Sequence, residues 1–170
     1  MELKDYIRNI QDYPKKGILF RDITTLLQNK DAFKYAIDKM AEQISSEKID
    51  YIVGAESRGF LVGSALAYKL NCGFIPVRKK GKLPYKTISE EYALEYGTDT
   101  LYMHEDAIKK GERVLIVDDL IATGGTALAM IKMVERLEGI VVGSSFLIEL
   151  KELNGRKEIE KYPVNVLIQY

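Results

Sequence analysis

The stretch that decides the fold spans residues 113–130 and reads R-V-L-I-V-D-D-L-I-A-T-G-G-T-A-L-A-M. Its apolar run at 114–117, in which three of four residues are β-branched, is typical of a strand buried on both faces of a parallel sheet. Asp118 and Asp119 stand where this strand is expected to end. A glycine turn follows, and the Ala, Met and Leu content of 127–137 favours a helix. The stretch predicts a strand, an acidic tip, a turn and a helix N-terminus in that order.

The turn after the aspartates is chemically suited to an anion. Paired glycines can adopt positive φ, so several backbone N–H groups can approach one guest. The first helical turn adds unpaired N–H donors and the positive end of its dipole, and two threonine hydroxyls add further donors. We therefore expect a phosphate to be bound by Ala122, Thr123, Gly124, Gly125 and Thr126.

The two carboxylates before the turn would repel a phosphate that bound alone. They are explained by a bifunctional ligand, which carries hydroxyls that donate to Asp118 and Asp119, or a divalent metal held with them, a few ångströms from its phosphate. A sugar phosphate meets this description. A solvated turn with chance acidic residues is the alternative, but it explains neither the doubled aspartate nor the doubled glycine.

The sequence V-L-I-V-D-D-L-I-A-T-G-G-T resembles the phosphoribosyl pyrophosphate (PRPP) signature of the type I phosphoribosyltransferases. Its form D-D-L-x-A-T-G-G-T is more similar to the adenine branch than to the orotate or hypoxanthine branches. The resemblance implies the α/β type I phosphoribosyltransferase fold, with about five parallel strands flanked by helices in a single domain over residues 1–170. It also implies an N-terminal hood over 1–30 and a flexible lid loop over 80–100.

Length and composition agree with one domain and exclude several partners. The 170 residues suit a single core, and 25 basic and 25 acidic residues cancel, so no global field favours nucleic acid or membrane. The single cysteine, Cys72, cannot form an internal disulfide and is expected to be a small buried hydrophobe. The charged start M-E-L-K-D-Y predicts neither a signal peptide nor an anchor, so we expect a cytoplasmic location.

The remaining chain supplies further elements of the same fold. Helical spacing predicts a short helix within 2–10, a helix over 32–44 capped by Asp31, and a helix over 60–70. His104, the only histidine, is expected to be an exposed surface residue. The expected strands cover 49–53, 73–77, 114–117, 140–150 and 162–168. Intervening helices make parallel connections and a doubly wound sheet the expected topology.

A second strand, loop and helix sequence carries E-S-R-G-F-L at 56–61. It is neither a Walker P-loop nor a G-x-G-x-x-G motif. It resembles the pyrophosphate loop of the adenine branch, which assigns Ser57 and Arg58 to pyrophosphate and in which the peptide between Glu56 and Ser57 is often cis. Next, P-V-R-K-K-G-K-L-P resembles the family's basic loop, which implies a homodimer and assigns pyrophosphate contacts to Arg78, Lys79 and Lys82.

Two further segments resemble the family's acceptor site. L-E-Y-G at 94–97 lies in a hairpin-like excursion over 83–100, and the resemblance places Glu95 near the purine imidazole ring as a proton handler. G-I-L-F-R-D-I-T-T-L-L resembles the adenine-binding hood, which implies ring contacts from Leu19 and Phe20 and base reading by backbone groups around Leu19 and Arg21. Lys16 and Thr25 depart from prolines that are usual in the family.

The resemblance predicts a purine salvage enzyme that transfers the 5-phosphoribosyl group from PRPP to adenine with Mg²⁺ and yields AMP and pyrophosphate. Glu95, Asp118 and Asp119 are the expected catalytic residues, and no protein ligand is assigned to the metal, which arrives with PRPP. Two alternatives stay open: a xanthine or hypoxanthine phosphoribosyltransferase, and a PRPP-sensing regulator of the same fold. The regulator needs a DNA-reading module, for which about 30 residues before the core leave too little room.

Overall fold

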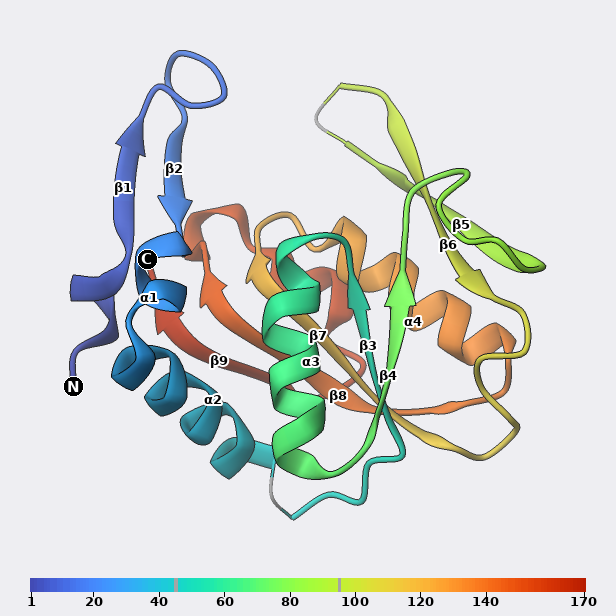
Figure 1. Ribbon diagram of the computed structural model, residues 1–170. Coiled ribbons are helices and arrows are strands. Elements are labelled where there is room, and N and C mark those ends of the chain that lie inside the picture. Colours follow the sequence, from blue (N-terminus) through green and yellow to red (C-terminus); the bar gives the residue numbers. More distant parts are fainter. Residues whose placement is uncertain (45, 95) are drawn as a thin grey trace.

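The computed structural model describes residues 1–44, 46–94 and 96–170. Its centre is a five-stranded sheet with the order β4-β3-β7-β8-β9, and every neighbouring pair is parallel (Figure 1). The predicted α/β architecture is therefore confirmed. The strands of this sheet are β3 (Tyr51–Ala55), β4 (Gly73–Val77), β7 (Arg113–Ile121), β8 (Ile140–Glu149) and β9 (Val164–Gln169).

Helices cover both faces of the sheet. Leu115 and Val117 pack into the core beneath α2 and α3, whereas Val114 and Ile116 pack beneath α4, so this strand is buried on both sides as its apolar run predicts. Within the described ranges, no helix combines the length and apolar character needed to cross a bilayer. The helices are η1 (Leu3–Tyr6), α1 (Thr24–Gln28), α2 (Lys30–Ile44), α3 (Arg58–Leu70), α4 (Gly125–Arg136), η2 (Lys151–Leu153) and η3 (Gly155–Ile159).

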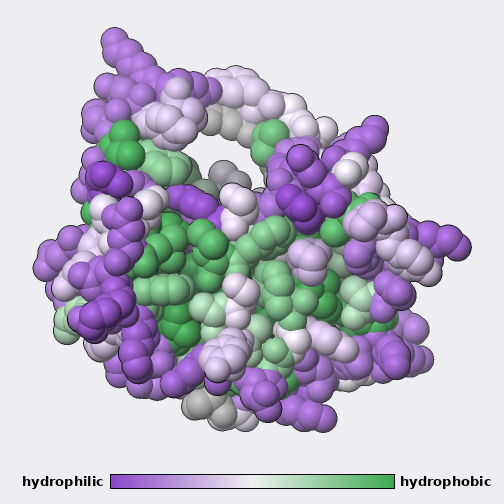
Figure 2. All heavy atoms as spheres, in the orientation of Figure 1, coloured by the Kyte–Doolittle hydropathy of each residue, from purple (hydrophilic) through white to green (hydrophobic). Residues whose placement is uncertain are grey.

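Two antiparallel hairpins rise beyond the carboxyl ends of the parallel strands (Figure 1). Their tips approach each other, because the Lys15 Nζ atom lies 5.1 Å from the centre of the Tyr96 ring. Figure 2 shows a hollow beneath the arch that they form. One hairpin pairs β1 (Arg8–Gln11) with β2 (Leu19–Asp22), and the other pairs β5 (Thr87–Ala93) with β6 (Thr98–His104).

The structure corrects one predicted segment and confirms another. The helix expected within 2–10 is wrong, because only the short η1 forms and β1 then pairs with β2, so long-range pairing overrides local spacing. The hairpin-like excursion expected over 83–100 forms the β5–β6 hairpin, which makes up most of the expected lid loop over 80–100. Leu101 and Met103 in β6 are buried in the core, so the root of this hairpin is fixed.

Smaller corrections concern single residues. The cap of α2 is Asn29 rather than Asp31, because the Asn29 side chain accepts hydrogen bonds from the N–H groups of Asp31 and Ala32. His104 is half-buried at the end of β6, with its ring edge-on to Tyr85 at 6.0 Å, and is not the exposed residue expected. Cys72 is half-buried against the core, and burial raises the pKa of its thiol.

Candidate active site

The paired aspartates lie within β7 rather than after it. The strand continues because Leu120 pairs with Ile148 and Ile121 pairs with Glu149 of β8. Asp118 is half-buried, and the Asp119 residue is 6% exposed. Continued pairing fixes the backbone of both carboxylates, which a loose loop would not do.

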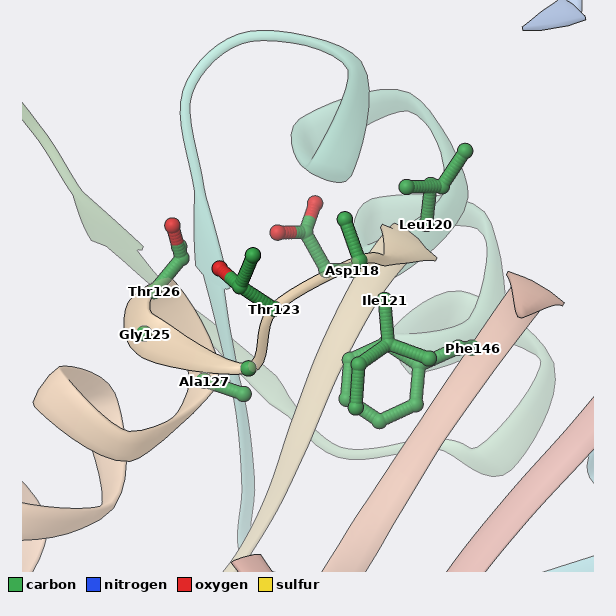
Figure 3. Close-up of a pocket in the computed structure, with 10 residues that line it drawn as sticks. Asp118, Leu120, Ile121, Thr123, Gly125, Thr126, Ala127 and Phe146 are labelled. Carbon is green, nitrogen blue, oxygen red and sulfur yellow. The ribbon is translucent and has the colours of Figure 1, made fainter. Parts of the chain in front are cut away.

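A pocket of about 220 Å³ opens between the end of β7 and the start of α4. Gly124 has a φ of 89°, the left-handed conformation that glycine adopts without strain, and α4 begins at the next residue. In Figure 3 the hydroxyls of Thr123 and Thr126 and the carboxylate of Asp118 lie on the same side of the turn. The pocket is lined by Asp118, Leu120, Ile121, Ala122, Thr123, Gly124, Gly125, Thr126, Ala127 and Phe146.

The two carboxylates repel each other, and a nearby cation offsets part of that repulsion. Burial and then the neighbouring charge of Asp119 raise the pKa of Asp118 well above its ordinary value. One Asp118 oxygen accepts a hydrogen bond of 2.9 Å from the Asp119 N–H. The Arg58 Nε atom lies 2.8 Å from the Asp119 Oδ2 atom, an ion pair whose N–H is not directed well enough for a hydrogen bond. Arg58 thus offsets part of the mutual repulsion.

Arg58 also connects this acidic pair to the hood. Its Nη1 atom donates a hydrogen bond of 3.1 Å to the Arg21 carbonyl oxygen, and its guanidinium carbon lies 4.9 Å from the centre of the Phe20 ring. Arg58 is the first residue of α3, directly after Ser57. The structure therefore brings the predicted base-binding segment beside the predicted sugar-binding carboxylates.

The three predicted hood residues lie on β2 but differ in orientation. Leu19 is 39% exposed, and the Phe20 ring meets the Tyr13 ring edge-on at 5.0 Å. The Arg21 guanidinium instead lies 3.7 Å from the centre of the Tyr170 ring and donates a hydrogen bond of 2.5 Å to Asn9. Arg21 is thus held against the C-terminal residue, and only its backbone remains beside Arg58.

The loops expected at pyrophosphate converge on Glu56. The peptide between Glu56 and Ser57 is cis, as the resemblance implies. One Glu56 carboxylate oxygen accepts hydrogen bonds from the Arg78 Nε atom at 3.2 Å and from the Lys79 N–H at 2.8 Å. Lys82 is exposed a few residues further along. The hydrogen bonds to this carboxylate hold the basic loop beside the start of α3.

Lys79 reaches from the basic loop to the β5–β6 hairpin. Its ammonium group forms an ion pair with Asp99 and donates a hydrogen bond of 2.8 Å to the Tyr92 hydroxyl. Burial lowers the pKa of Lys79, but the bonds to Asp99 and Tyr92 outweigh it, so the net shift is upward. The same contact lowers the pKa of Asp99. The hairpin is therefore tied to a cation predicted to bind pyrophosphate.

Sequence reasoning missed three residues that shape this site. Glu56 organises the basic loop, Asp99 holds Lys79, and Gly155 lies against the turn 122–126. Only Glu56 had a usable signal, because it stands inside the E-S-R-G motif. Asp99 and Gly155 reach the site through long-range contacts that no local pattern shows. The predicted proton handler, Glu95, lies outside the described residues.

Comparisons with known proteins agree with this geometry. A model of the phosphoribosyl transferase domain matches residues 23–169. An adenine phosphoribosyltransferase of Brachyspira hyodysenteriae is 98% identical over the full length of both chains. The crystal structure of adenine phosphoribosyltransferase from Thermoanaerobacter pseudethanolicus is 53% identical, covering 99% of this chain and 98% of that chain with a TM-score of 0.97.

A further solved relative carries ligands. The adenine phosphoribosyltransferase of Saccharomyces cerevisiae, complexed with D-2,5-dideoxy-2,5-imino-altritol 1,6-bisphosphate and adenine, is 44% identical with a TM-score of 0.91, and the match covers 98% of this chain and 96% of that chain. The matched domain, the full-length relatives and the shared architecture lead to one conclusion: this chain belongs to the phosphoribosyltransferases and, within them, to the adenine phosphoribosyltransferase family.

Proposed function

We propose that the protein transfers the 5-phosphoribosyl group of PRPP to adenine in a Mg²⁺-dependent reaction that yields AMP and pyrophosphate. One observation carries the proposal: the Asp118 carboxylate and the donor-rich turn that ends at Thr126 line the same pocket. A carboxylate accepts hydrogen bonds from sugar hydroxyls, whereas the turn and the α4 N-terminus offer donors to a phosphate. The 5-phosphoribosyl group presents both chemistries at adjacent positions.

The roles of the site residues follow from this placement. The 5′-phosphate lies in the turn 122–126 at the start of α4, and the ribose hydroxyls face Asp118 and Asp119. The pyrophosphate is bound by cations around the cis peptide and the basic loop, because paired phosphate oxygens suit guanidinium and ammonium groups. These pyrophosphate-binding residues are Ser57, Arg58, Arg78, Lys79 and Lys82.

Adenine lies beneath the hood. The Phe20 ring and the exposed Leu19 side chain offer apolar contact to a purine. Backbone groups around Leu19 and Arg21 read the amino edge, which a 6-oxopurine would leave unpaired. Support for this placement is that Arg58 touches both the Phe20 ring and Asp119, so a base beside Phe20 is close to a sugar beside the carboxylates.

In the reaction the purine N9 atom bonds to C1 of the ribose, and the bond from C1 to the pyrophosphate oxygen breaks. The electron pair leaves with pyrophosphate, and the N9 proton passes to Glu95 or to solvent. Positive charge develops on the ribose ring, so the carboxylates of Asp118 and Asp119 stabilise the transition state electrostatically, and the cations hold the departing anion. No protein group forms a covalent bond to the substrate.

The residues fit a magnesium ion that arrives with its substrate. Across the described part of the chain, no group of three or more His, Cys, Asp or Glu side chains could hold a metal on its own. Asp119 is already paired with Arg58, and Asp118 faces the pocket, so the protein supplies too few oxygen ligands without PRPP. When bound, Mg²⁺ neutralises pyrophosphate oxygens and eases their departure.

We also propose that the protein works as a cytoplasmic homodimer. Apolar residues on the outer side of α3 support this, since Leu61 is 49% and Tyr68 is 91% exposed. Figure 2 shows hydrophobic residues gathered on the face where α3 and the edge strand β4 lie in Figure 1. The basic loop leaves the end of the edge strand β4, so a second copy on this face would lie beside that loop.

One competition assay tests the proposed activity. Adenine, hypoxanthine, guanine and xanthine are supplied together with PRPP and Mg²⁺, and the nucleotides formed are identified by chromatography. We expect AMP to be the main product. Formation of a 6-oxopurine nucleotide instead would support the xanthine or hypoxanthine alternative, whereas PRPP binding without turnover would support a PRPP-sensing regulator.

A further inference from the structure

Glu149 and Arg156 form an ion pair outside the pocket but close to its phosphate turn. Glu149 is 4% exposed, and its two carboxylate oxygens accept bonds from the Arg156 Nε and Nη2 atoms at 2.6 and 2.9 Å. Gln169 donates a further hydrogen bond of 2.9 Å to Glu149, and Arg156 donates one of 3.2 Å to the Val164 carbonyl oxygen. This fork-like pairing fixes Arg156 against β8 and β9.

Gly155, the residue before Arg156, lies directly against the phosphate turn. A methyl group at Gly155 would lie 2.4 Å from the Ala122 carbonyl oxygen and 3.0 Å from the Gly124 nitrogen. From the other side, a methyl group at Gly124 would lie 2.5 Å from the Gly155 carbonyl oxygen. No space for a Cβ atom exists between the two backbones, so a shift of Gly155 must displace the turn.

The ion pair is also anchored to the strand that carries the acidic pair. Glu149 pairs directly with Ile121, the last residue of β7 before the turn, and the Leu150 N–H donates a hydrogen bond of 3.1 Å to the Ile121 carbonyl oxygen. Arg156 lowers the pKa of Glu149 below its ordinary value, so this carboxylate is ionised at neutral pH. The backbone of the turn is therefore fixed at one end by the pairing of β7 with β8, and Gly155 packs against it.

We propose that Glu149 and Arg156 are positioning residues for phosphoribosyl transfer, which hold Gly155 against the turn and so keep its N–H groups aimed at the 5′-phosphate. Neither side chain lines the pocket, so both act through Gly155. The inference rests on the proposed function, because it assigns the 5′-phosphate to this turn. A displacement of 1 Å at such a site can cost about 10²-fold in activity.

The test compares two ligands that use different parts of the site. Ribose 5-phosphate depends on the turn, whereas pyrophosphate depends on the loops around Arg58 and Lys79. In the full-length Arg156→Met variant we expect affinity for ribose 5-phosphate to fall by about 10-fold, within the loss that a 1 Å misplacement can cause. Affinity for pyrophosphate should change by less than about twofold, and the KM for PRPP should rise more than kcat falls.

Conservative variants separate positioning from general stability. Arg156→Lys keeps the positive charge but cannot form the paired hydrogen bonds to Glu149. Its affinity for ribose 5-phosphate should therefore lie between those of Arg156→Met and the wild type. Arg113→Met is the matched control, because Arg113 binds the Glu47 carboxylate at 2.8 Å and the Lys48 carbonyl oxygen at 2.9 Å at the opposite end of β7. We expect the control to lower the melting temperature without changing the ratio of the two affinities.

The outcomes distinguish the inference from the proposed function. If Arg156→Met does not fold, Arg156→Lys and Gly155→Ala take its place, and both should weaken ribose 5-phosphate selectively. An unchanged ratio of the two affinities in the folded variants would overturn the positioning role alone. Failure of the wild-type protein to bind either ligand would overturn the proposed function as well.

Discussion

Asp118 occupies a position that destabilises its ionised carboxylate. Its carboxylate lies beside the Asp119 carboxylate and is half-buried, and both features raise its pKa. A carboxylate in such a place is less stable when ionised than it is in the unfolded chain. The proposed phosphoribosyl ligand accounts for this placement, because its hydroxyls and developing positive charge would favour the ionised form.

Replacement of Asp118 by asparagine should raise the stability of the protein and lower its activity. Because the folded-state pKa is raised, ionisation costs stability as the pH rises from the unfolded value of about 3.9 through the folded value. We expect the variant to melt above the wild type at pH 7 to 8, by roughly 2–4 °C for each kcal/mol of ionisation cost removed. The difference should vanish near pH 3.

The same Asp118→Asn variant should lose activity by about 10²-fold, the scale of one electrostatic contact in a transition state. Thermal melts from pH 3 to 8 and steady-state kinetics check both effects. A variant that melts with the wild type at every pH would show that the buried charge carries no penalty, and full activity would remove Asp118 from the mechanism.

Replacement of Glu95 tests whether this residue handles a proton rather than binds PRPP. We expect Glu95→Gln to lower turnover by about 10²-fold, since a positioned acid or base contributes that much or more, with little change in PRPP affinity. Glu91→Gln, at an exposed position of β5, is the control. The measurement is kcat together with PRPP binding by calorimetry, and unchanged turnover would contradict the assigned role.

Among the elements, the β5–β6 hairpin is tied at both its root and its side. Leu101 and Met103 are buried in the core at the root of the hairpin. The ion pair between Lys79 and Asp99 joins the side of the hairpin to the basic loop. Pyrophosphate would compete with Asp99 for Lys79. The proposed pyrophosphate contact at Lys79 would therefore couple binding of the leaving group to the position of the hairpin.

Asp99→Asn should strengthen pyrophosphate binding. A partly exposed ion pair contributes about 0.2–1 kcal/mol, so freeing Lys79 should lower the inhibition constant of pyrophosphate by up to about fivefold. Asp106→Asn removes the same charge from an exposed position and serves as the control. Product-inhibition kinetics check the effect, and an Asp99→Asn enzyme with weaker pyrophosphate inhibition would contradict it.

Periodicity predicted the elements of the parallel sheet well, because buried strands and amphipathic helices carry strong local patterns. It failed at β1, where pairing with β2 decides the conformation, and it underestimated β7, which continues through Asp118 to Ile121 because β8 extends beside it. Motifs singled out Asp118 and the turn 122–126, which line the pocket, but not Phe146. They did not predict Asp99 or Gly155, whose importance depends on contacts distant in sequence.

For the whole molecule, the two hairpins stand over one end of the parallel sheet and border a common hollow (Figure 2). The hood and the β5–β6 hairpin approach each other through Lys15 and Tyr96 above the carboxyl ends of the strands (Figure 1). The apolar outer side of α3 faces away from this space. The fold therefore separates a ligand-binding end from a face suited to a second copy of the chain.

A charge on that face should disrupt the proposed homodimer. We expect Leu61→Asp and Tyr68→Asp to convert the protein to a monomer, because each places a carboxylate in an apolar contact. Ile140→Asp alters a comparably exposed apolar residue at the start of β8, and should leave assembly unchanged. Sedimentation velocity gives the answer, and wild-type protein that sediments as a monomer would overturn the proposal.

Calorimetric titration of the full-length protein with PRPP in magnesium buffer is the most direct test of the central claim, that the carboxylates of β7 and the turn before α4 bind one phosphoribosyl group. We predict saturable binding of one PRPP per chain, competed by ribose 5-phosphate. Absence of PRPP binding under these conditions would contradict the account.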